Sequence, residues 1–218
     1  PSGAIDLRTA KIATSLMMLI SLVCMFLAWF TVDSMGNEFS EWLPSLVIWL
    51  VALFLLANYE FPSSLRLKDR GLPGNIAISI SVGLVVVFGA AGVLQPYNQR
   101  AWALFFVGVL YNTSREVVKD IEDMDGDEGR NTLAMRLGAD SARTVSWVIS
   151  LAALAAVIMP FALEIFSPLH VVFTIPAVIS LMMVKSKLLM GEDNAASALL
   201  KRSMMLCLAA FLGSSLLG

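Results

Sequence analysis

The chain contains one strongly acidic segment, between Glu116 and Glu128, in a sequence that is otherwise mostly apolar. Seven of these thirteen residues are Asp or Glu, and the whole chain has only 17 acidic residues. Carboxylates packed this densely repel one another unless a cation neutralises them. Mg²⁺ prefers carboxylate oxygens and usually shares its coordination shell with water and substrate phosphates. The segment therefore predicts a magnesium site that handles a phosphorylated substrate.

The spacing of the acidic residues favours the same interpretation. If the preceding apolar helix continues, four carboxylates fall at i, i+4, i+7 and i+11 and share one face: Glu116, Asp120, Asp123 and Asp127. Like charges on one face destabilise a helix, so a helix with a purely structural role would not favour this pattern. A solvated loop of mixed charge is the structural alternative, and the density and spacing of the carboxylates make it the weaker one.

Basic residues accompany the carboxylates. Lys119 and Arg130 flank the acidic segment, and a second loop, residues 60–75, carries three more: Arg66, Lys68 and Arg70. Lys and Arg side chains are the usual partners of phosphate oxygens. Carboxylates that hold Mg²⁺ beside cations that hold phosphate are what a diphosphate substrate requires.

The composition is that of a membrane protein, with 58% apolar and only 15% charged residues. About 20 helical residues cross a bilayer, and the long apolar runs lack the period-two alternation of strands. We therefore predict an all-α, multi-pass transmembrane helical bundle. Seven spans are expected: Ala10–Val32, Leu43–Tyr59, Ile76–Leu94, Ala101–Val118, Thr144–Phe166, Leu169–Val184 and Ala198–Leu217. The fourth turns polar at residues 112–114.

The distribution of basic residues gives an independent test of the span count. Taking the spans in order, 14 of the 15 Lys and Arg residues fall at one set of ends, and Arg100 alone falls at the other. Because basic residues concentrate on the cytoplasmic side, we expect the N-terminus and the acidic loop to be cytoplasmic and the C-terminus to be outside. Asn75 is expected to cap the third span, and Asp140 or Ser141 the fifth.

The acidic segment resembles the second aspartate-rich motif of the UbiA-type intramembrane prenyltransferases. The residues that carry the resemblance are Lys119-Asp120-Ile121-Glu122-Asp123-Met124-Asp125-Gly126-Asp127 and Asn131-Thr132-Leu133-Ala134. The loop from Leu67 to Asn75 is similar to another cytoplasmic connection of that superfamily, and Pro1-Ser2-Gly3 to the end of its R-P-I-P-S-G segment. Within the superfamily the chain looks most like the archaeal digeranylgeranylglyceryl phosphate synthases.

The resemblance implies a nine-helix fold in which two aspartate-rich motifs face each other over a central cavity. The seven spans would be helices three to nine, in a single transmembrane domain over residues 1–218. The chain starts at Pro1 without an initiator Met, so we expect it to be an N-terminally truncated piece. It would lack the first two helices and the first motif, N-D-x-x-D, and would be inactive alone.

The resemblance also implies a mechanism and a set of site residues. Mg²⁺ assists the ionisation of an allylic prenyl diphosphate, and an acceptor hydroxyl captures the allylic cation. Asp123 and Asp127 would form the metal-binding D-x-x-x-D pair, with Asp120 as a third acidic contributor. The candidates for binding the diphosphate or the acceptor phosphate are Lys119, Arg66, Lys68 and Arg130.

The favoured function is transfer of a geranylgeranyl group to geranylgeranylglyceryl phosphate in archaeal ether-lipid synthesis. The partners would be a prenyl diphosphate donor, a lipid-like phosphate acceptor and membrane lipid, with no nucleic acid. A prenyltransferase with a quinone, chlorophyll or haem precursor as acceptor is the alternative within the family. A small membrane transporter is a more distant one, because Glu164 is almost the only ionisable residue inside a span.

Overall fold

The computed structural model describes residues 6–60, 64–124, 126 and 131–217. All regular structure in this part of the chain is helical, which confirms the all-α prediction. The long helices are α1 (Leu7–Ser34), α2 (Phe39–Glu60), α3 (Leu72–Gly92), α4 (Gln99–Glu122), α6 (Ala139–Ala162), α7 (Ile175–Leu189) and α8 (Asp193–Leu217). Three short elements lie between them: the 3₁₀ helix η1 (Leu67–Asp69), α5 (Leu133–Leu137) and the 3₁₀ helix η2 (Pro168–Thr174).

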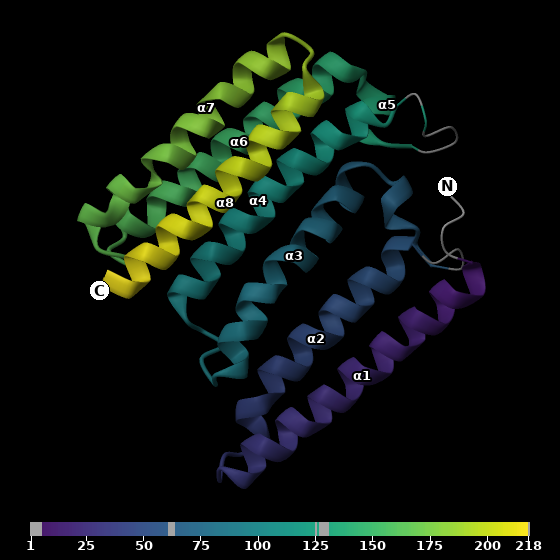
Figure 1. Ribbon diagram of the computed structural model, residues 1–218, viewed down its shortest axis with the longest axis vertical. Helices are drawn as coiled ribbons and strands as arrows, with labels where there is room; N and C mark the ends of the chain where they lie inside the picture. The colour runs from purple at the N-terminus through teal and green to yellow at the C-terminus, as the bar shows by residue number, and fades with distance from the viewer. Residues whose placement is uncertain (1–5, 61–63, 125, 127–130, 218) are drawn as a thin grey trace.

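Helix α4 is the centre of the bundle. It packs against α3 on one side and against α6 and α8 on the other, as Figure 1 shows. Beyond α3 the row continues with α2 and then α1, and α7 packs against α8. The main buried core joins α4, α6, α7 and α8. Its aromatic centre includes Phe161 and Phe211, whose rings stack with centroids 5.4 Å apart.

The described helices support a membrane-embedded protein. Six of the predicted spans are confirmed as helices long and apolar enough to cross a membrane: α1, α2, α3, α6, the η2–α7 unit and α8. Large apolar side chains point outward from them, including Met17, Phe26 and Phe30 on α1, each about 70% exposed. A contiguous apolar surface of this kind marks contact with lipid or with another protein.

The seventh predicted span, α4, is as long as the others but more polar. Its polar side chains are turned toward neighbouring helices: the Tyr111 hydroxyl lies 2.8 Å from the Ser203 hydroxyl on α8. The Ser114 hydroxyl lies 2.9 Å from that of Ser146 and 2.8 Å from that of Ser150, both on α6. In an apolar environment each such group needs an internal partner, and α4 finds them on both flanks. Its central place explains why its composition differs.

Two predicted helix caps are wrong. Helix α3 begins at Leu72 after Gly71, so Asn75 lies inside the first turn instead of capping it. Pro73 suits this earlier start, because proline is tolerated in the first turn of a helix. Helix α6 begins at Ala139 after Gly138, which places Asp140 in the first turn.

Two other differences concern the ends of elements. The fifth span was expected to reach Phe166, but α6 ends at Ala162 and Glu164 has a positive φ of 58°, which a helix cannot accommodate. The chain after the acidic segment contains the short helix α5, which is not among the seven predicted spans. The Thr132 hydroxyl caps α5 by accepting a hydrogen bond from the Met135 backbone N–H at 3.3 Å.

The connections gather at two opposite ends of the bundle. In Figure 1, η1, α5 and the α7–α8 turn lie at one end. The α1–α2 and α3–α4 turns and the end of α8 lie at the other. The basic loop and the acidic end of α4 therefore share one end, as the alternation of basic residues predicted.

Two glycines bring the basic loop and the acidic loop together. A Cβ on Gly74 would collide with the Leu67 carbonyl and lie 3.3 Å from the Lys68 Cα, so η1 rests directly on the first turn of α3. Gly71 has a φ of +63°, and a Cβ there would lie 2.9 Å from the Leu133 backbone N. Glycine is required at both positions, because any side chain would push η1 or α5 away from α3.

The substitution Gly74→Ala tests this packing. We expect it to lower the thermal unfolding midpoint of the detergent-solubilised protein, because η1 must move off α3 to admit the methyl group. Gly89→Ala is the matched control on the same helix, since a Cβ there meets nothing within 4 Å. Alanine favours a helix over glycine by about 0.5–1 kcal/mol, so the control should not lose stability. Equal midpoints for Gly74→Ala and the wild type would contradict the packing described.

Candidate metal and diphosphate site

The acidic segment is only partly helical. Helix α4 ends at Glu122, and Asp123 is its C-terminal cap. The chain then turns, with the Gly126 backbone N–H donating to the Asp123 carbonyl at 3.0 Å. The prediction that one helical face carries all four carboxylates through Asp127 is therefore wrong. Asp127 and Arg130 lie outside the described residues.

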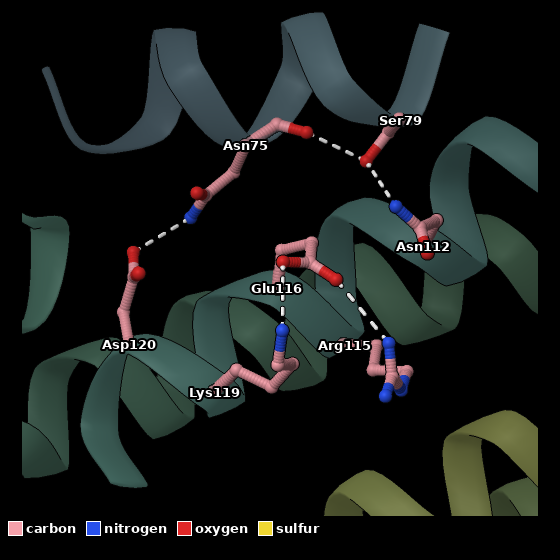
Figure 2. A network of polar contacts seen from close by, with 7 residues as sticks. All are labelled: Asn75, Ser79, Asn112, Arg115, Glu116, Lys119 and Asp120. Carbon is pink, nitrogen blue, oxygen red and sulfur yellow. Dashed lines mark hydrogen bonds and ion pairs between the residues drawn. The ribbon is translucent and has the colours of Figure 1, made fainter. Parts of the chain in front are cut away.

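Asp120 faces α3. Its Oδ2 accepts a hydrogen bond from the Asn75 amide at 2.9 Å, across the α3–α4 interface (Figure 2). Asn75 is buried, with 6% of its surface exposed, while Asp120 is half-buried. The carboxylate is thus held at the boundary between the helix interface and its surroundings.

The polar chain continues along α3 away from Asp120. The Asn75 carbonyl accepts a hydrogen bond from the Ser79 hydroxyl at 2.6 Å. The Ser79 oxygen in turn accepts one from the Asn112 amide of α4 at 3.1 Å. Figure 2 shows these residues on facing sides of the two helices. Two separate hydrogen bonds therefore join α3 to α4, about one turn apart on α3.

Glu116 lies between two cations of its own helix. Its carboxylate is 3.2 Å from an Arg115 guanidinium nitrogen and 3.5 Å from the Lys119 ammonium (Figure 2). The Lys119 side chain keeps 40% of its surface exposed, and exposed pairs of this length contribute little binding energy. Lys119 therefore remains accessible to a stronger anion, as its predicted role requires.

The other predicted phosphate-binding residues lie on the η1 loop. Arg66 adopts a left-handed backbone conformation with φ 45°, and its guanidinium is 2.8 Å from the Asp69 carboxylate. The Arg66 side chain is 55% exposed, whereas Lys68 is half-buried and has a contact within the fold. The loop rests on the turn of α3 that carries Asn75, so it lies beside the residue that holds Asp120.

The end of α4 carries a further carboxylate that faces the opposite way. Glu122 hydrogen-bonds with Ser197 near the start of α8. Burial raises the pKa of the Glu122 carboxyl above its ordinary value, and the Ser197 hydrogen bond opposes this rise. The acidic residues of α4 therefore divide between two interfaces, with Asp120 toward α3 and Glu122 toward α8.

The donor set fits Mg²⁺. Asp120 and Asp123 lie three residues apart at the end of α4, a spacing that puts Cβ atoms about 5–6 Å apart on a helix surface. Both are hard oxygen donors. Among the residues that the structure describes, no three acidic, histidine or cysteine side chains converge as a metal cage. Mg²⁺ does not need one, because it commonly takes one or two carboxylates together with water and substrate phosphate.

A large apolar groove lies elsewhere on α4. It has a volume of about 640 Å³ and runs between α4 and α6, lined by residues such as Trp102, Phe106 and Ala156. These α4 residues precede the acidic turns, and the groove is on the α6 side of the helix. It is therefore separate from Asp120 and the η1 loop.

Asn75, Ser79 and Asn112 form a hydrogen-bond chain to Asp120 that the sequence does not predict. The sequence predicts a helix cap at Asn75. The polar run that begins at Asn112 was visible within an otherwise apolar span, and polar groups in such a span face other helices. That signal could have identified α4 as the helix around which the site is built. It could not have identified the partners on α3.

Known proteins resemble the chain in both sequence and structure. The profile of the UbiA prenyltransferase family matches residues 1–211. Digeranylgeranylglyceryl phosphate synthase of Haloquadratum walsbyi is 32% identical over 175 residues, which cover 78% of this chain and 59% of that protein. The enzyme of the same name from Methanothermobacter thermautotrophicus is 32% identical over 179 residues, which cover 79% of this chain and 60% of that protein.

A solved structure of a digeranylgeranylglyceryl phosphate synthase has the same architecture. It matches with a TM-score of 0.73 and 25% sequence identity, over 98% of this chain and 72% of that one. The chain spans about three fifths of the length of the curated relatives it matches.

The α3–α4 hydrogen-bond chain can be tested through Ser79. The substitution Ser79→Ala removes a hydroxyl that both donates and accepts, so we expect the free energy of unfolding to fall by about 0.6–1.7 kcal/mol, the range for polar contacts between membrane helices. Ser81→Ala is the control, because the Ser81 hydroxyl donates to the Ala77 carbonyl of its own helix at 3.0 Å. Unfolding in mixed detergent micelles measures both. An equal loss in the two variants would refute an interhelical role for Ser79.

Proposed function

The chain belongs to the UbiA prenyltransferase family, and we propose that it transfers a geranylgeranyl group from geranylgeranyl diphosphate to geranylgeranylglyceryl phosphate. In this reaction the bond between the allylic carbon and the diphosphate oxygen breaks. The acceptor hydroxyl forms an ether bond to that carbon and loses its proton, and pyrophosphate leaves. The names of the relatives from Haloquadratum walsbyi and Methanothermobacter thermautotrophicus support this choice of acceptor.

The observation that carries the proposal is the cluster of carboxylates at the C-terminal end of α4. The helix macrodipole places partial negative charge there, which disfavours Asp and Glu and favours cations. Glu116, Asp120, Glu122 and Asp123 nevertheless occupy the last two turns and the cap, with Lys119 as the basic residue of the last turn. A bound divalent cation removes this conflict. Bound there, Mg²⁺ would offset the negative charge that develops on a departing diphosphate.

The residues of this chain divide the work of binding. Asp120 and Asp123 would hold the metal together with Asp127. Lys119, Lys68 and Arg66 would hold phosphate oxygens of the donor or acceptor, with Arg130 as a further candidate. Arg66 is exposed and its partner Asp69 lies on the same loop, so the guanidinium can exchange one anion for another at small cost.

The membrane supplies the rest of the environment. The site lies at the end of the bundle where basic residues concentrate, which we assign to the cytoplasmic side. A lipid-like donor and acceptor would keep their isoprenoid chains among the apolar helices while their phosphates reach the end of α4. Diphosphate and acceptor phosphate would then meet at the membrane surface.

The complete gene product that contains these residues tests the proposal. We expect the purified protein to transfer label from radiolabelled geranylgeranyl diphosphate to geranylgeranylglyceryl phosphate when Mg²⁺ is present, and to lose transfer with EDTA. Asp123→Asn should reduce kcat by about 10²–10³-fold, because it removes charge that acts on the leaving group through the metal. Thin-layer separation of the labelled products measures transfer.

Asp140→Asn is the matched control for this experiment. Asp140 is almost fully exposed at the start of α6 and pairs with Arg143 at 2.7 Å, so it lies outside the proposed site. Its loss should leave transfer unchanged. An aromatic acceptor such as 4-hydroxybenzoate, supplied in parallel, distinguishes the alternative substrate class. Preference for that acceptor would overturn the acceptor assignment, and unchanged turnover in Asp123→Asn would overturn the metal assignment.

A further inference from the structure

We propose that Asn75 is a positioning residue, which fixes the carboxylate of Asp120 in the orientation that binds the metal. The inference rests on the proposed function, because it concerns the same site. Asn75 would not contact the metal or the substrate. It would act through its hydrogen bond to Asp120, the only one of the predicted acidic ligands whose side chain is seen bonded to another helix among the described residues.

The contact has the geometry that such a role needs. The Asn75 amide donates to Asp120 Oδ2 at 2.9 Å from a buried position on α3. A hydrogen bond to an ionised acceptor is stronger than one between neutral groups, and burial strengthens it further. With one carboxylate oxygen fixed by the amide, rotation of the Asp120 side chain is restricted. Groups that orient metal ligands in this way commonly set the affinity of a site.

Asn75 is itself held in place. Its carbonyl accepts from Ser79, which is bonded to Asn112 of α4 (Figure 2). The backbone of Leu67 and Lys68 packs directly against Gly74, the neighbour of Asn75. Asn75 therefore lies where the basic η1 loop, α3 and the acidic turn of α4 meet. A shift at this position would move the carboxylate and the cations relative to each other.

A purely structural role does not account for this residue. Asn75 does not cap α3, which begins three residues earlier. Asn is a poorer helix former than Ala or Leu, and a buried amide costs free energy unless it is hydrogen-bonded. The α3–α4 interface already has the Ser79–Asn112 hydrogen bond. An apolar residue would pack there more cheaply, whereas orientation of a carboxylate requires a donor.

Metal binding by the detergent-solubilised complete gene product is the direct test. Mn²⁺ titration followed by electron paramagnetic resonance gives the dissociation constant without turnover. We expect Asn75→Ala to weaken Mn²⁺ binding about 10–100-fold, the usual effect of removing a partner of a metal ligand. The Mg²⁺ concentration for half-maximal transfer should rise by a similar factor. In the Asp120→Ala background, Asn75→Ala should have no further effect on either quantity.

Ser150→Ala controls for loss of packing. Ser150 belongs to the buried serine cluster between α4 and α6, away from Asp120. Its substitution should lower the unfolding midpoint and leave Mn²⁺ affinity unchanged. Equal Mn²⁺ affinity in Asn75→Ala and the wild type would overturn the positioning role, and so would an equal loss of affinity in Ser150→Ala.

The outcomes also separate this inference from the proposed function. If the wild type binds Mn²⁺ and transfers the prenyl group while Asn75→Ala matches it, the function stands and the role of Asn75 falls. If the wild type shows no metal-dependent prenyl transfer, the proposed function falls, and the positioning role falls with it.

Discussion

The structure depends on one constraint: a polar side chain in an apolar bundle must find its hydrogen-bond partner within the protein. Helix α4 buries four such side chains in succession, at residues 111–114, and neighbouring helices on several flanks offer them partners. Tyr111 turns to α8, Ser114 to α6 and Asn112 to α3. A helix with polar groups on several flanks is stable only if it is surrounded, so α4 lies in the middle of the bundle. The flanking helices present their apolar faces outward.

The same constraint places the candidate site. Along α4 the hydrogen-bonded polar groups give way to charged ones toward the C-terminal end, where the helix leaves the apolar interior. Asp120 is still tied to α3, whereas Asp123 is exposed at the cap. Exposure of the carboxylates therefore increases from Asp120, which is hydrogen-bonded to an amide, to Asp123 at the helix end. A metal that must bind both protein and diphosphate is best served at such a boundary.

The sequence was sufficient to predict the features that depend on the length, hydropathy and charge of single segments. Length and hydropathy located the helices, because about 20 apolar residues cross a membrane wherever they occur. The alternation of basic residues assigned the connections to two ends, as seen. Features that depend on contacts between residues far apart in the sequence could not be predicted in this way. Asn75 has the sequence signature of a cap, and only packing against α4 shows that its amide reaches Asp120. The end of α4 at Glu122 likewise depends on a turn that helical spacing does not reveal.

Two segments far apart in the sequence pack against the start of α3: the basic loop before it and the chain that follows the acidic segment. Gly71 and Gly74 have no side chain, so the backbone of each neighbouring segment can pack directly against them. The Leu67 carbonyl lies against Gly74, and the Leu133 backbone N lies against Gly71. Through α3, the basic loop and the chain that follows the acidic segment therefore share one support, although more than sixty residues separate them in sequence. Substrate phosphates bound by the basic loop would then keep a fixed position relative to the carboxylates at the end of α4, as a reaction at a single carbon–oxygen bond demands.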